Sequence, residues 1–506
     1  MLAVRALLTG VLVLLLPLCG CSIGGGDAAA KKPKRPYAVL VVFDEFPADT
    51  LLGPNGRIDA GRFPNFAALA GDATWFRNAA TAYDSTTKAV PLILDGIRPH
   101  RGTSPIARDH RHSIFTALGG RGYRIETAEE ATALCPRRYC RRARTTRPQI
   151  IPNLKGGRAE RFGRFVRSIR PTRRPTFWMK HALLPHGPWV YTPSGLHSRP
   201  EGPELLPGMQ TVPGFYDDYL TRHNEQRYLL QLGFVDRLLG RLVGRLKSQG
   251  MYDDTLIVVT ADHGFAWQVG VPTRRTISLS NVGELAPVPL FVKKPRQKRA
   301  RVSDALARTL DVTPTIADVL GVPLGYRADG RSAFSRAVRA RREVSLTTRD
   351  FSATVRISRA QWKARRRAIV RRRLRHLGSG DWASLFTSLG PNRDLIGEGV
   401  ASARNARGTR ATISLSRSFA HVRRSSGIVP SQIAGRIHGS GAPRERDLAI
   451  AVNGRIEAVG RSFRLRGETV ESYSVMVPED ALREGRNTVE VLEVTDEGAM
   501  LLLARS

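Results

Sequence analysis

The stretch Thr255-Leu-Ile-Val-Val-Thr-Ala-Asp-His-Gly264 decides the fold of this chain. It begins as a continuous apolar run, which is typical of a strand buried on both faces of a parallel sheet. The run stops abruptly at Asp262 and His263, whose side chains are both good metal ligands. The sequence therefore predicts a buried strand with functional groups at its carboxyl end.

A second stretch of the same kind lies near the N-terminus, where the apolar residues 37–43 end on Asp44 and Glu45. A third apolar stretch covers residues 288–292. Helical patterns accompany these strands, at residues 63–70, 224–247 and 312–320. Strands that alternate with helices indicate an α/β domain with a mostly parallel sheet. In such sheets the functional sites lie at the carboxyl ends of the strands, where both acidic pairs are expected.

Hydroxyl side chains gather where residues 83–96 pass from a loop into a helix. A helix N-terminus favours anions through its free backbone N–H groups and its dipole. Carboxylates and an imidazole form a ligand set for Zn²⁺ or Mn²⁺, and a metal ion can activate a threonine hydroxyl, which is otherwise a poor nucleophile. Thr86 is the expected nucleophile, and Thr87 is the alternative. Together these parts predict that an alkoxide attacks a phosphorus or sulfur centre.

In this chain order the motifs resemble the sulfatase-like branch of the alkaline phosphatase superfamily, over residues 38–324. The resemblance is most specific at residues 235–240, 254–256 and 260–264. It implies an alkaline-phosphatase-like α/β fold, with a mostly parallel sheet flanked by helices. Formylglycine sulfatases have Cys or Ser where this chain has Thr86, Pro where it has Lys88, and Arg where it has Val90. Since threonine cannot form their aldehyde hydrate, the segment is more similar to the lipid A phosphoethanolamine transferases, in which threonine is the nucleophile.

The resemblance also implies a metal site. Asp44, Asp262 and His263 correspond to metal ligands, with the Thr86 hydroxyl as a further ligand. Glu45 is either another ligand or a supporting group. The expected cofactor is one divalent metal ion, either Zn²⁺, Mn²⁺ or Ca²⁺. A second ion is not predicted, since the chain lacks the histidine that the transferases place about a dozen residues after Asp-His-Gly.

Further residues are assigned roles by the same resemblance. His186 is expected to hydrogen-bond a non-bridging oxygen of the substrate or to protonate the leaving group. Arg274, Arg275 or Lys88 would neutralise developing charge. His181 resembles the first histidine of the pair found in the transferases, but it and Trp189 are equally compatible with simple core packing.

The first residues predict export to the envelope of a bacterial cell. Arg5 precedes an apolar run at residues 6–18, and Leu-Cys-Gly-Cys21 resembles the lipoprotein box, so Cys21 is the expected lipidation site. A plain cleaved signal or an uncleaved anchor are the alternatives. The protein is thus expected to be exported and anchored to the membrane as a lipoprotein. In such a protein the closely spaced Cys135 and Cys140 suggest a disulfide, with two free thiols as the other reading.

The predicted organisation has five parts. They are a lipoprotein signal peptide at 1–21, a flexible tether at 22–36, a sulfatase-like catalytic domain at 37–345, an Arg-rich helical linker region at 346–405 and a β-sandwich-like domain at 406–506. Within the linker, residues 361–377 are interpreted as a solvated surface helix. In the small C-terminal all-β domain, Asn453-Gly454 after a strand is a strong signal for a hairpin.

The 506 residues carry a net charge of +36, from 80 Lys and Arg against 44 Asp and Glu. The basic residues are scattered through the chain, so no nucleic-acid partner is expected. The predicted function is an envelope-anchored, metal-dependent hydrolase or transferase of phosphate esters with a threonine nucleophile. Its partners would be an anionic phosphate- or sulfate-ester substrate and, through the lipid anchor, the membrane. The alternatives are a sulfuric-ester hydrolase of the same fold and a catalytically inactive surface binding protein.

Overall fold

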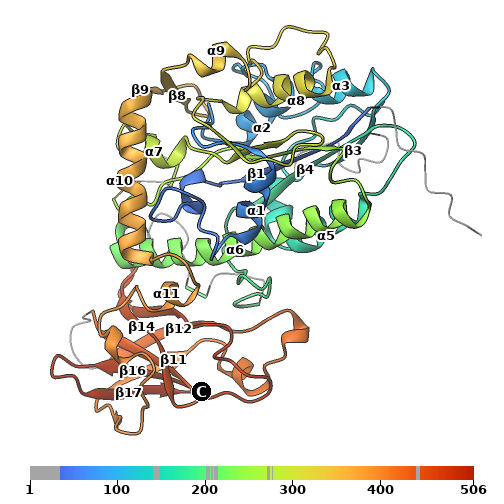
Figure 1. The fold of residues 1–506 in the computed structure, drawn as a ribbon. Helices are drawn as coiled ribbons and strands as arrows, with labels where there is room; N and C mark the ends of the chain where they lie inside the picture. The colour runs from blue at the N-terminus through green and yellow to red at the C-terminus, as the bar shows by residue number, and fades with distance from the viewer. Residues whose placement is uncertain are drawn as a thin grey trace, which may run out of the picture.

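The structure is a computed structural model, and it describes residues 35–140, 149–200, 205–206, 209, 215–270, 274–275, 277–439 and 445–506. The predicted lipidation site Cys21 and the tether up to residue 34 lie outside the described residues. A larger α/β body and a smaller all-β body make up the fold, and Figure 1 shows the smaller one beneath the larger. No helix among the described residues is long and apolar enough to cross a membrane.

The α/β body is built on a seven-stranded sheet in the order β3-β4-β1-β5-β6-β2-β7. Its strands are β1 (Tyr37–Asp44), β2 (Thr74–Phe76), β3 (Arg124–Ala128), β4 (Thr176–Pro185), β5 (Thr255–Ala261), β6 (Leu290–Lys293) and β7 (Arg301–Ser303). β1 runs parallel to both β4 and β5, whereas β6 runs antiparallel to β5 and to β2. The predicted α/β fold with a mostly parallel sheet is confirmed, and the third apolar stretch is its antiparallel exception.

Helices cover both faces of this sheet, which is why every residue of β1 and β5 is buried. One face is covered by α1 (Pro64–Asp72), α5 (Arg158–Ser168) and α6 (Asp218–Ser248), and the other by α2 (Thr86–Asp95), α3 (Ile114–Gly119) and α8 (Val312–Leu320). Shorter helices are α4 (Ile150–Leu154), α7 (Val282–Leu285) and α9 (Arg336–Arg339). α6 begins six residues before its predicted start, because Asp217 caps it by accepting a hydrogen bond from the Leu220 N–H.

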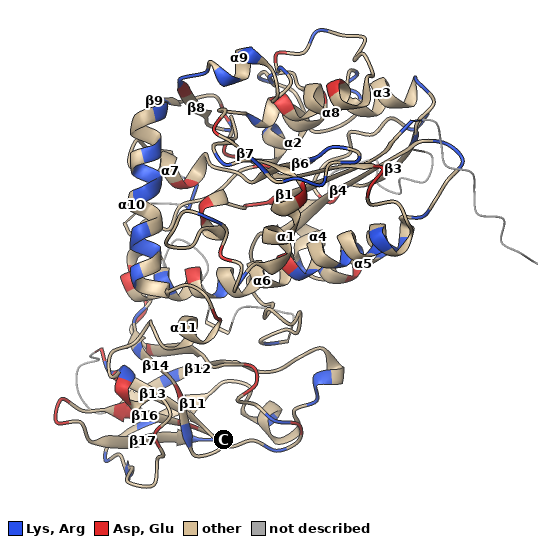
Figure 2. Ribbon diagram, viewed as in Figure 1, with Lys and Arg blue, Asp and Glu red and all other residues tan. Residues whose placement is uncertain are grey.

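The helix α10 (Arg359–Leu377), whose Lys and Arg residues are blue in Figure 2, packs on the α/β body after the two-stranded sheet of β8 (Glu343–Thr347) and β9 (Thr354–Ser358). Its buried Arg366 binds both carboxylate oxygens of Asp49, at 2.8 and 2.6 Å. Its buried Arg373 donates to the carbonyl oxygens of Thr50 and Leu52. The interpretation as a solvated helix is therefore wrong for this face. Hydrophobic periodicity did not predict this contact, because the side chains that make these hydrogen bonds are arginines.

The all-β body has eight strands in the order β10-β17-β16-β13-β14-β15-β12-β11. They are β10 (Arg404–Asn405), β11 (Thr409–Ile413), β12 (Gln432–Gly439), β13 (Asp447–Val452), β14 (Arg455–Phe463), β15 (Glu471–Met476), β16 (Val489–Val494) and β17 (Met500–Arg505), with α11 (Ala383–Phe386) preceding them. Asn453 and Gly454 join β13 to β14 with φ of 53° and 84°, so the predicted hairpin is confirmed. An all-β C-terminal unit is likewise as predicted.

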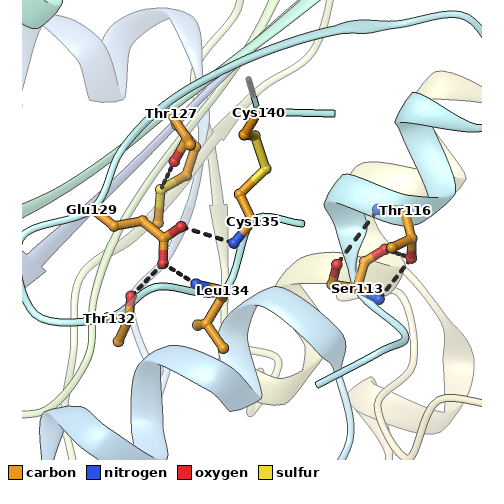
Figure 3. Close-up of a disulfide and its surroundings, with 9 residues drawn as sticks. Ser113, Thr116, Thr127, Glu129, Thr132, Leu134, Cys135 and Cys140 are labelled. Atoms are coloured by element: carbon orange, nitrogen blue, oxygen red, sulfur yellow. Dashed lines mark hydrogen bonds between the residues drawn. A yellow bond between two sulfur atoms is a disulfide. The ribbon is translucent and has the colours of Figure 1, made fainter. Parts of the chain in front are cut away.

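The predicted disulfide between Cys135 and Cys140 is present (Figure 3). Beside it, the Glu129 carboxylate accepts hydrogen bonds from the Thr132 hydroxyl and from the N–H groups of Leu134 and Cys135. The carboxylate and the disulfide together fix this short loop after β3. Disulfides of this kind are typical of proteins that leave the reducing cytosol.

A buried ion pair holds β4 to the segment after β3. The Glu130 carboxylate forms an ion pair with Lys180 of β4, and it also accepts a hydrogen bond from Arg161 at 3.2 Å. Burial alone would raise the pKa of Glu130, but the two cations outweigh it and lower the pKa to about 2. The carboxylate therefore stays charged well into the acid range.

Replacing Glu130 with Gln should lower the free energy of unfolding by about 3 kcal/mol at pH 7, because it leaves Lys180 buried without its partner. The contribution is present above the unfolded pKa of about 4.5 and is lost as the pH falls towards 2. Urea unfolding at several pH values measures it. Glu126→Gln, which breaks the half-exposed pair with Arg124, is the control and should cost under about 1 kcal/mol. Equal losses for both variants would contradict the prediction.

Candidate functional site

The carboxyl ends of β1 and β5 lie side by side and bring the two predicted acidic pairs together. Phe43 pairs with Ala261 in register, so Asp44 and Asp262 follow the two strands at the same level. Both carboxylates are fully buried, as are Glu45 and His263. Glu45 has φ of 57°, a backbone conformation that non-glycine residues rarely adopt, and its N–H donates to Asp262 Oδ1 at 3.2 Å. This turn ends β1 and fixes the direction of both side chains.

Thr86 is the first residue of α2 and lies against these groups. The Thr86 hydroxyl donates to Asp44 Oδ2 at 3.3 Å, and Thr86 Oγ1 also lies 3.4 Å from His263 Nε2. The alternative hydroxyl of Thr87 is buried without a hydrogen-bond partner among the described residues. Of the two hydroxyls, that of Thr86 thus contacts the acidic strand ends, whereas that of Thr87 forms no hydrogen bond in the described part of the chain. Among the described residues, no side chain caps the N-terminus of α2, which leaves its first N–H groups available to an anion.

The tautomer of His263 follows from its neighbours. Its Nδ1 lies 2.8 Å from the carbonyl oxygen of Gly264, which can only accept, so Nδ1 carries the proton. Nε2 therefore presents a lone pair towards Thr86 and towards Asp262 Oδ2, which is 3.5 Å away. Burial, reinforced by the charge of Arg275, lowers the pKa of His263 to about 3. A neutral imidazole held by a backbone carbonyl is the form that binds metal ions.

The two aspartates lack enough partners for their charge. Burial, together with the nearby Asp262 and Glu45 charges, raises the pKa of Asp44 well above its usual value. Burial raises the pKa of Asp262 to about 7. Asp44 Oδ1 and Asp262 Oδ2 have no hydrogen-bond partner among the described residues. Since buried charges are normally paired or bound to a metal, this cluster calls for a cation.

The donor set fits a divalent metal ion. Four ligands at about 2.1 Å from a tetrahedral ion lie about 3.4 Å from one another. The separations here are 3.3 Å between Thr86 Oγ1 and Asp44 Oδ2, 3.4 Å between Thr86 Oγ1 and His263 Nε2, and 3.5 Å between His263 Nε2 and Asp262 Oδ2. These three contacts suit ligands of one ion, and Asp44 also forms possible metal-binding groups with Glu45 and His186 and with His181 and Asp262.

Glu45 points to a different partner. It binds Arg274 Nε at 3.1 Å and Arg275 Nε at 2.8 Å. Burial would raise its pKa, but the charges of Arg274, His186 and Arg275 together lower it well below the usual value. Glu45 is therefore an ionised carboxylate already neutralised by guanidinium groups. The sequence assigned these arginines only to charge neutralisation, and nothing in its pattern showed their pairing with Glu45.

His186 joins this cluster of Glu45 and the two arginines. Its Nδ1 lies 2.6 Å from the carbonyl oxygen of Gly187, so Nε2 carries the lone pair and accepts from Arg275 at 3.1 Å. Burial and the neighbouring arginines lower the pKa of His186 to about 4, although Glu45 opposes the shift. The imidazole is thus neutral at physiological pH. Its Nε2 accepts a hydrogen bond in this arrangement, whereas the predicted role as a donor requires a proton there.

Other predicted residues lie elsewhere. Lys88 donates from Nζ to the carbonyl oxygen of Thr103 at 2.8 Å. Trp189 packs in a cluster of aromatic rings with Tyr228, Phe265 and Trp267, so core packing accounts for it. His181, by contrast, lies on β4 with its Nε2 3.7 Å from Asp44 Oδ2 and forms a possible metal-binding group with Asp44 and Asp262. The sequence left it between core packing and function.

The chain is similar to known proteins over part of its length. The chain is 35% identical over 103 residues to the multifunctional alkaline phosphatase superfamily protein PehA of Trinickia caryophylli, which covers 19% of each chain. It is 27% identical over 106 residues to arylsulfatase K of Bos taurus, covering 21% of this chain and 19% of that one. It thus spans about a fifth of the length of these curated relatives.

A solved structure, the phosphonate monoester hydrolase of Agrobacterium radiobacter, superimposes with a TM-score of 0.48 and 19% identity, covering 63% of this chain and 81% of that one. The family model described as Sulfatase matches residues 36–322, which is more than half of the chain and includes β1, α2, β4 and β5. With the acidic strand ends and the hydroxyl of α2 all inside that match, this chain belongs to the sulfatase family.

Proposed function

We propose that this chain is a metal-dependent hydrolase or transferase of phosphate esters that uses Thr86 as its nucleophile. The observation that supports it is the position of the Thr86 hydroxyl, within 3.4 Å of both the Asp44 carboxylate and the neutral His263 imidazole. Among the relatives, one is named as a multifunctional alkaline phosphatase superfamily protein.

Asp44, Asp262, His263 and Thr86 would hold one divalent ion. When bound, the ion lowers the pKa of the hydroxyl and polarises the ester oxygens. Glu45 serves as a support, because its charge is already balanced by Arg274 and Arg275.

The protein groups then divide the reaction between them. The Thr86 oxygen, held beside Asp44 Oδ2, attacks the phosphorus in line as the bond to the leaving oxygen breaks, and the Thr86 proton passes to water. The uncapped N–H groups of α2 and the guanidinium of Arg275 stabilise the charge on the phosphoryl oxygens. Through Nε2, which is unprotonated at rest, His186 takes a proton from water and passes it to the leaving oxygen. Water, or an acceptor alcohol, then releases the phosphoryl group from Thr86.

A sulfuric-ester hydrolase is the second candidate, and the family match is the observation that favours it. Arylsulfatase K is also among the relatives. Threonine cannot supply the aldehyde hydrate of formylglycine sulfatases, which is why phosphate esters are the first choice. A catalytically inactive binding protein is the least favoured reading. In such a protein the two buried carboxylates of Asp44 and Asp262 would repel each other and destabilise the fold without serving a function.

We also propose that the protein acts in the bacterial envelope, held to the membrane through a lipid on Cys21. The disulfide between Cys135 and Cys140 supports an exported protein. For the domain organisation, we propose that the catalytic unit includes α10, since Arg366 and Arg373 join this helix to the segment after Glu45.

The purified protein should cleave a nitrophenyl phosphate ester in the presence of Zn²⁺ or Mn²⁺. Removal of the metal with EDTA should lower the rate by more than about 100-fold, because the hydroxyl then loses its activation, and added Zn²⁺ should restore it. Phosphate diester, phosphate monoester and sulfate with the same leaving group are assayed in parallel. Cleavage of the sulfate alone would move the protein to the sulfuric-ester hydrolases. No cleavage and no bound metal would favour the binding protein.

A further inference from the structure

His181 is a buried histidine that the proposed metal set leaves unused. It lies opposite Val42 in the register of β4 and β1. Since side chains alternate along a strand, its ring lies on the same face as Asp44, two residues further along β1. The neighbouring Lys180 points to the other face, where it bonds Glu130. In β4, therefore, Lys180 forms a structural ion pair on one face of the sheet, and His181 faces the candidate metal site on the other.

The ring of His181 has no hydrogen bond that would explain its burial. Neither Nδ1 nor Nε2 has a partner among the described residues, and the side chain is fully buried. The 3.7 Å between Nε2 and Asp44 Oδ2 is too long for a hydrogen bond but suits two ligands of one ion. One ring nitrogen of His181 and one carboxylate oxygen each of Asp44 and Asp262 lie within 4.8 Å of one another. The three side chains, each of which has a buried polar atom without a partner among the described residues, are therefore close enough to bind one ion.

We propose that His181 binds the metal ion through Nε2, in the place that Glu45 was expected to fill. Glu45 is held by Arg274 and Arg275, whereas His181 is a buried group beside Asp44 whose ring nitrogens have no partner among the described residues. The proposal deepens the proposed function by adding a ligand to its metal site.

This ligand bears on the choice of metal. With His181 the set contains two imidazoles, two carboxylates and one hydroxyl. Imidazole ligands suit Zn²⁺ and other transition metals, whereas Ca²⁺ prefers sites made of oxygen. The site therefore selects Zn²⁺ or Mn²⁺ over Ca²⁺, and His181 contributes directly to that selection.

The test uses the full chain with His181 replaced by Leu, and His223→Leu as the matched control. His223 is also fully buried, but its Nδ1 lies 3.2 Å from Gln226 Oε1 and its Nε2 2.9 Å from Ser474 Oγ. Zn²⁺ binding is measured by titration calorimetry, and the ligand field by the visible spectrum of the Co²⁺-loaded protein. Thermal unfolding of the metal-free proteins checks that each variant folds.

His181→Leu should weaken Zn²⁺ binding by more than about 100-fold, since changes to groups behind the ligands alone cost 10–100-fold. Its Co²⁺ spectrum should shift, and its metal-free melting temperature should not fall, because no hydrogen bond is lost. His223→Leu should show the reverse pattern, with a lower melting temperature and unchanged Zn²⁺ binding.

Wild-type Zn²⁺ affinity and an unchanged Co²⁺ spectrum in His181→Leu would overturn the proposal. If His181→Leu does not fold, His181→Asn takes its place, with the same expected loss of affinity and the same overturning result. The substrate assays separate this inference from the proposed function. Failure to cleave phosphate esters would end the proposed function, while a dependence of Zn²⁺ binding on His181 would still support the ligand.

Discussion

Thr86→Ala removes phosphate ester cleavage, with an expected loss of at least about 1000-fold in kcat, and leaves the fold intact. The hydroxyl is the attacking atom in the proposed reaction, so no covalent intermediate can form without it. The side chain is small, and its hydroxyl contacts only Asp44 and His263 among the described residues, two groups that a metal ion would also bind. Packing around the first turn of α2 therefore changes little. Steady-state rates and thermal unfolding measure the two effects.

Two neighbouring variants make this result specific. Thr87→Ala removes a hydroxyl of the same kind that has no hydrogen-bond partner among the described residues, so its rate should stay within a few-fold of wild type. Thr86→Ser keeps a hydroxyl and should retain measurable activity. Rapid quenching of the wild-type reaction should trap a phosphoryl group on Thr86. Activity that survives in Thr86→Ala would remove this residue from the nucleophile's role.

Asp262→Asn should abolish metal binding and activity, yet raise the stability of the metal-free protein. Asp262 Oδ2 has no partner among the described residues, and the carboxylate lies beside the charges of Asp44 and Glu45. In the wild type, the N–H groups of Glu45 and His263 donate to Asp262 Oδ1. Asparagine keeps an oxygen that can accept both hydrogen bonds, and it removes the buried charge. The change therefore relieves repulsion in the protein while it destroys the ligand, a trade of stability against function.

The free energy of unfolding of the metal-free protein should depend on pH in the direction that the raised pKa of Asp262 sets. The folded pKa of Asp262 is raised to about 7, above its unfolded value of 3.8, so its ionisation opposes folding. The penalty is complete above pH 7 and is relieved as the pH falls towards 4. Metal-free wild type should thus gain a few kcal/mol of unfolding free energy between pH 8 and pH 5 from this group. Asp262→Asn should lack this gain.

Asp236→Asn is the control for that experiment. Asp236 is also buried, but its oxygens accept hydrogen bonds from Asn65 and from the Phe66 N–H. This variant should lose about 1–3 kcal/mol of stability and keep its metal affinity. Urea unfolding with and without Zn²⁺ measures both variants. A metal-free Asp262→Asn protein that is less stable than wild type at pH 8 would contradict the prediction.

The parts of the fold that local sequence determines could be predicted. Continuous apolar runs identified β1 and β5, and Asn453-Gly454 identified the hairpin of the all-β body. The acidic pairs at the strand ends and the hydroxyls at the start of α2 also indicated where the candidate site lies, because parallel strands bring their carboxyl ends to one edge.

What the sequence could not predict depends on contacts between distant segments. The place of His181 beside Asp44 follows from the register of β4 against β1, which no local pattern encodes. The pairing of Glu45 with Arg274 and Arg275 joins residues 229 and 230 positions apart. Buried arginines help to hold α10 on the α/β body. Because a sequence-based prediction looks for apolar residues on a buried face, it assigns this face of the helix to solvent.

The long-range contact between α10 and the segment after β1 has a consequence for the making of the protein. Asp49 is held by Arg366, which is 317 residues later in the chain. A polypeptide leaves the ribosome, or crosses a membrane as an unfolded thread, with its N-terminus first. The segment that follows Asp44 and Glu45 therefore emerges early, and 317 further residues must follow Asp49 before Arg366 can bind it. An unfinished chain that stops short of α10 thus carries Asp44 and Glu45 without this contact to the neighbouring Asp49.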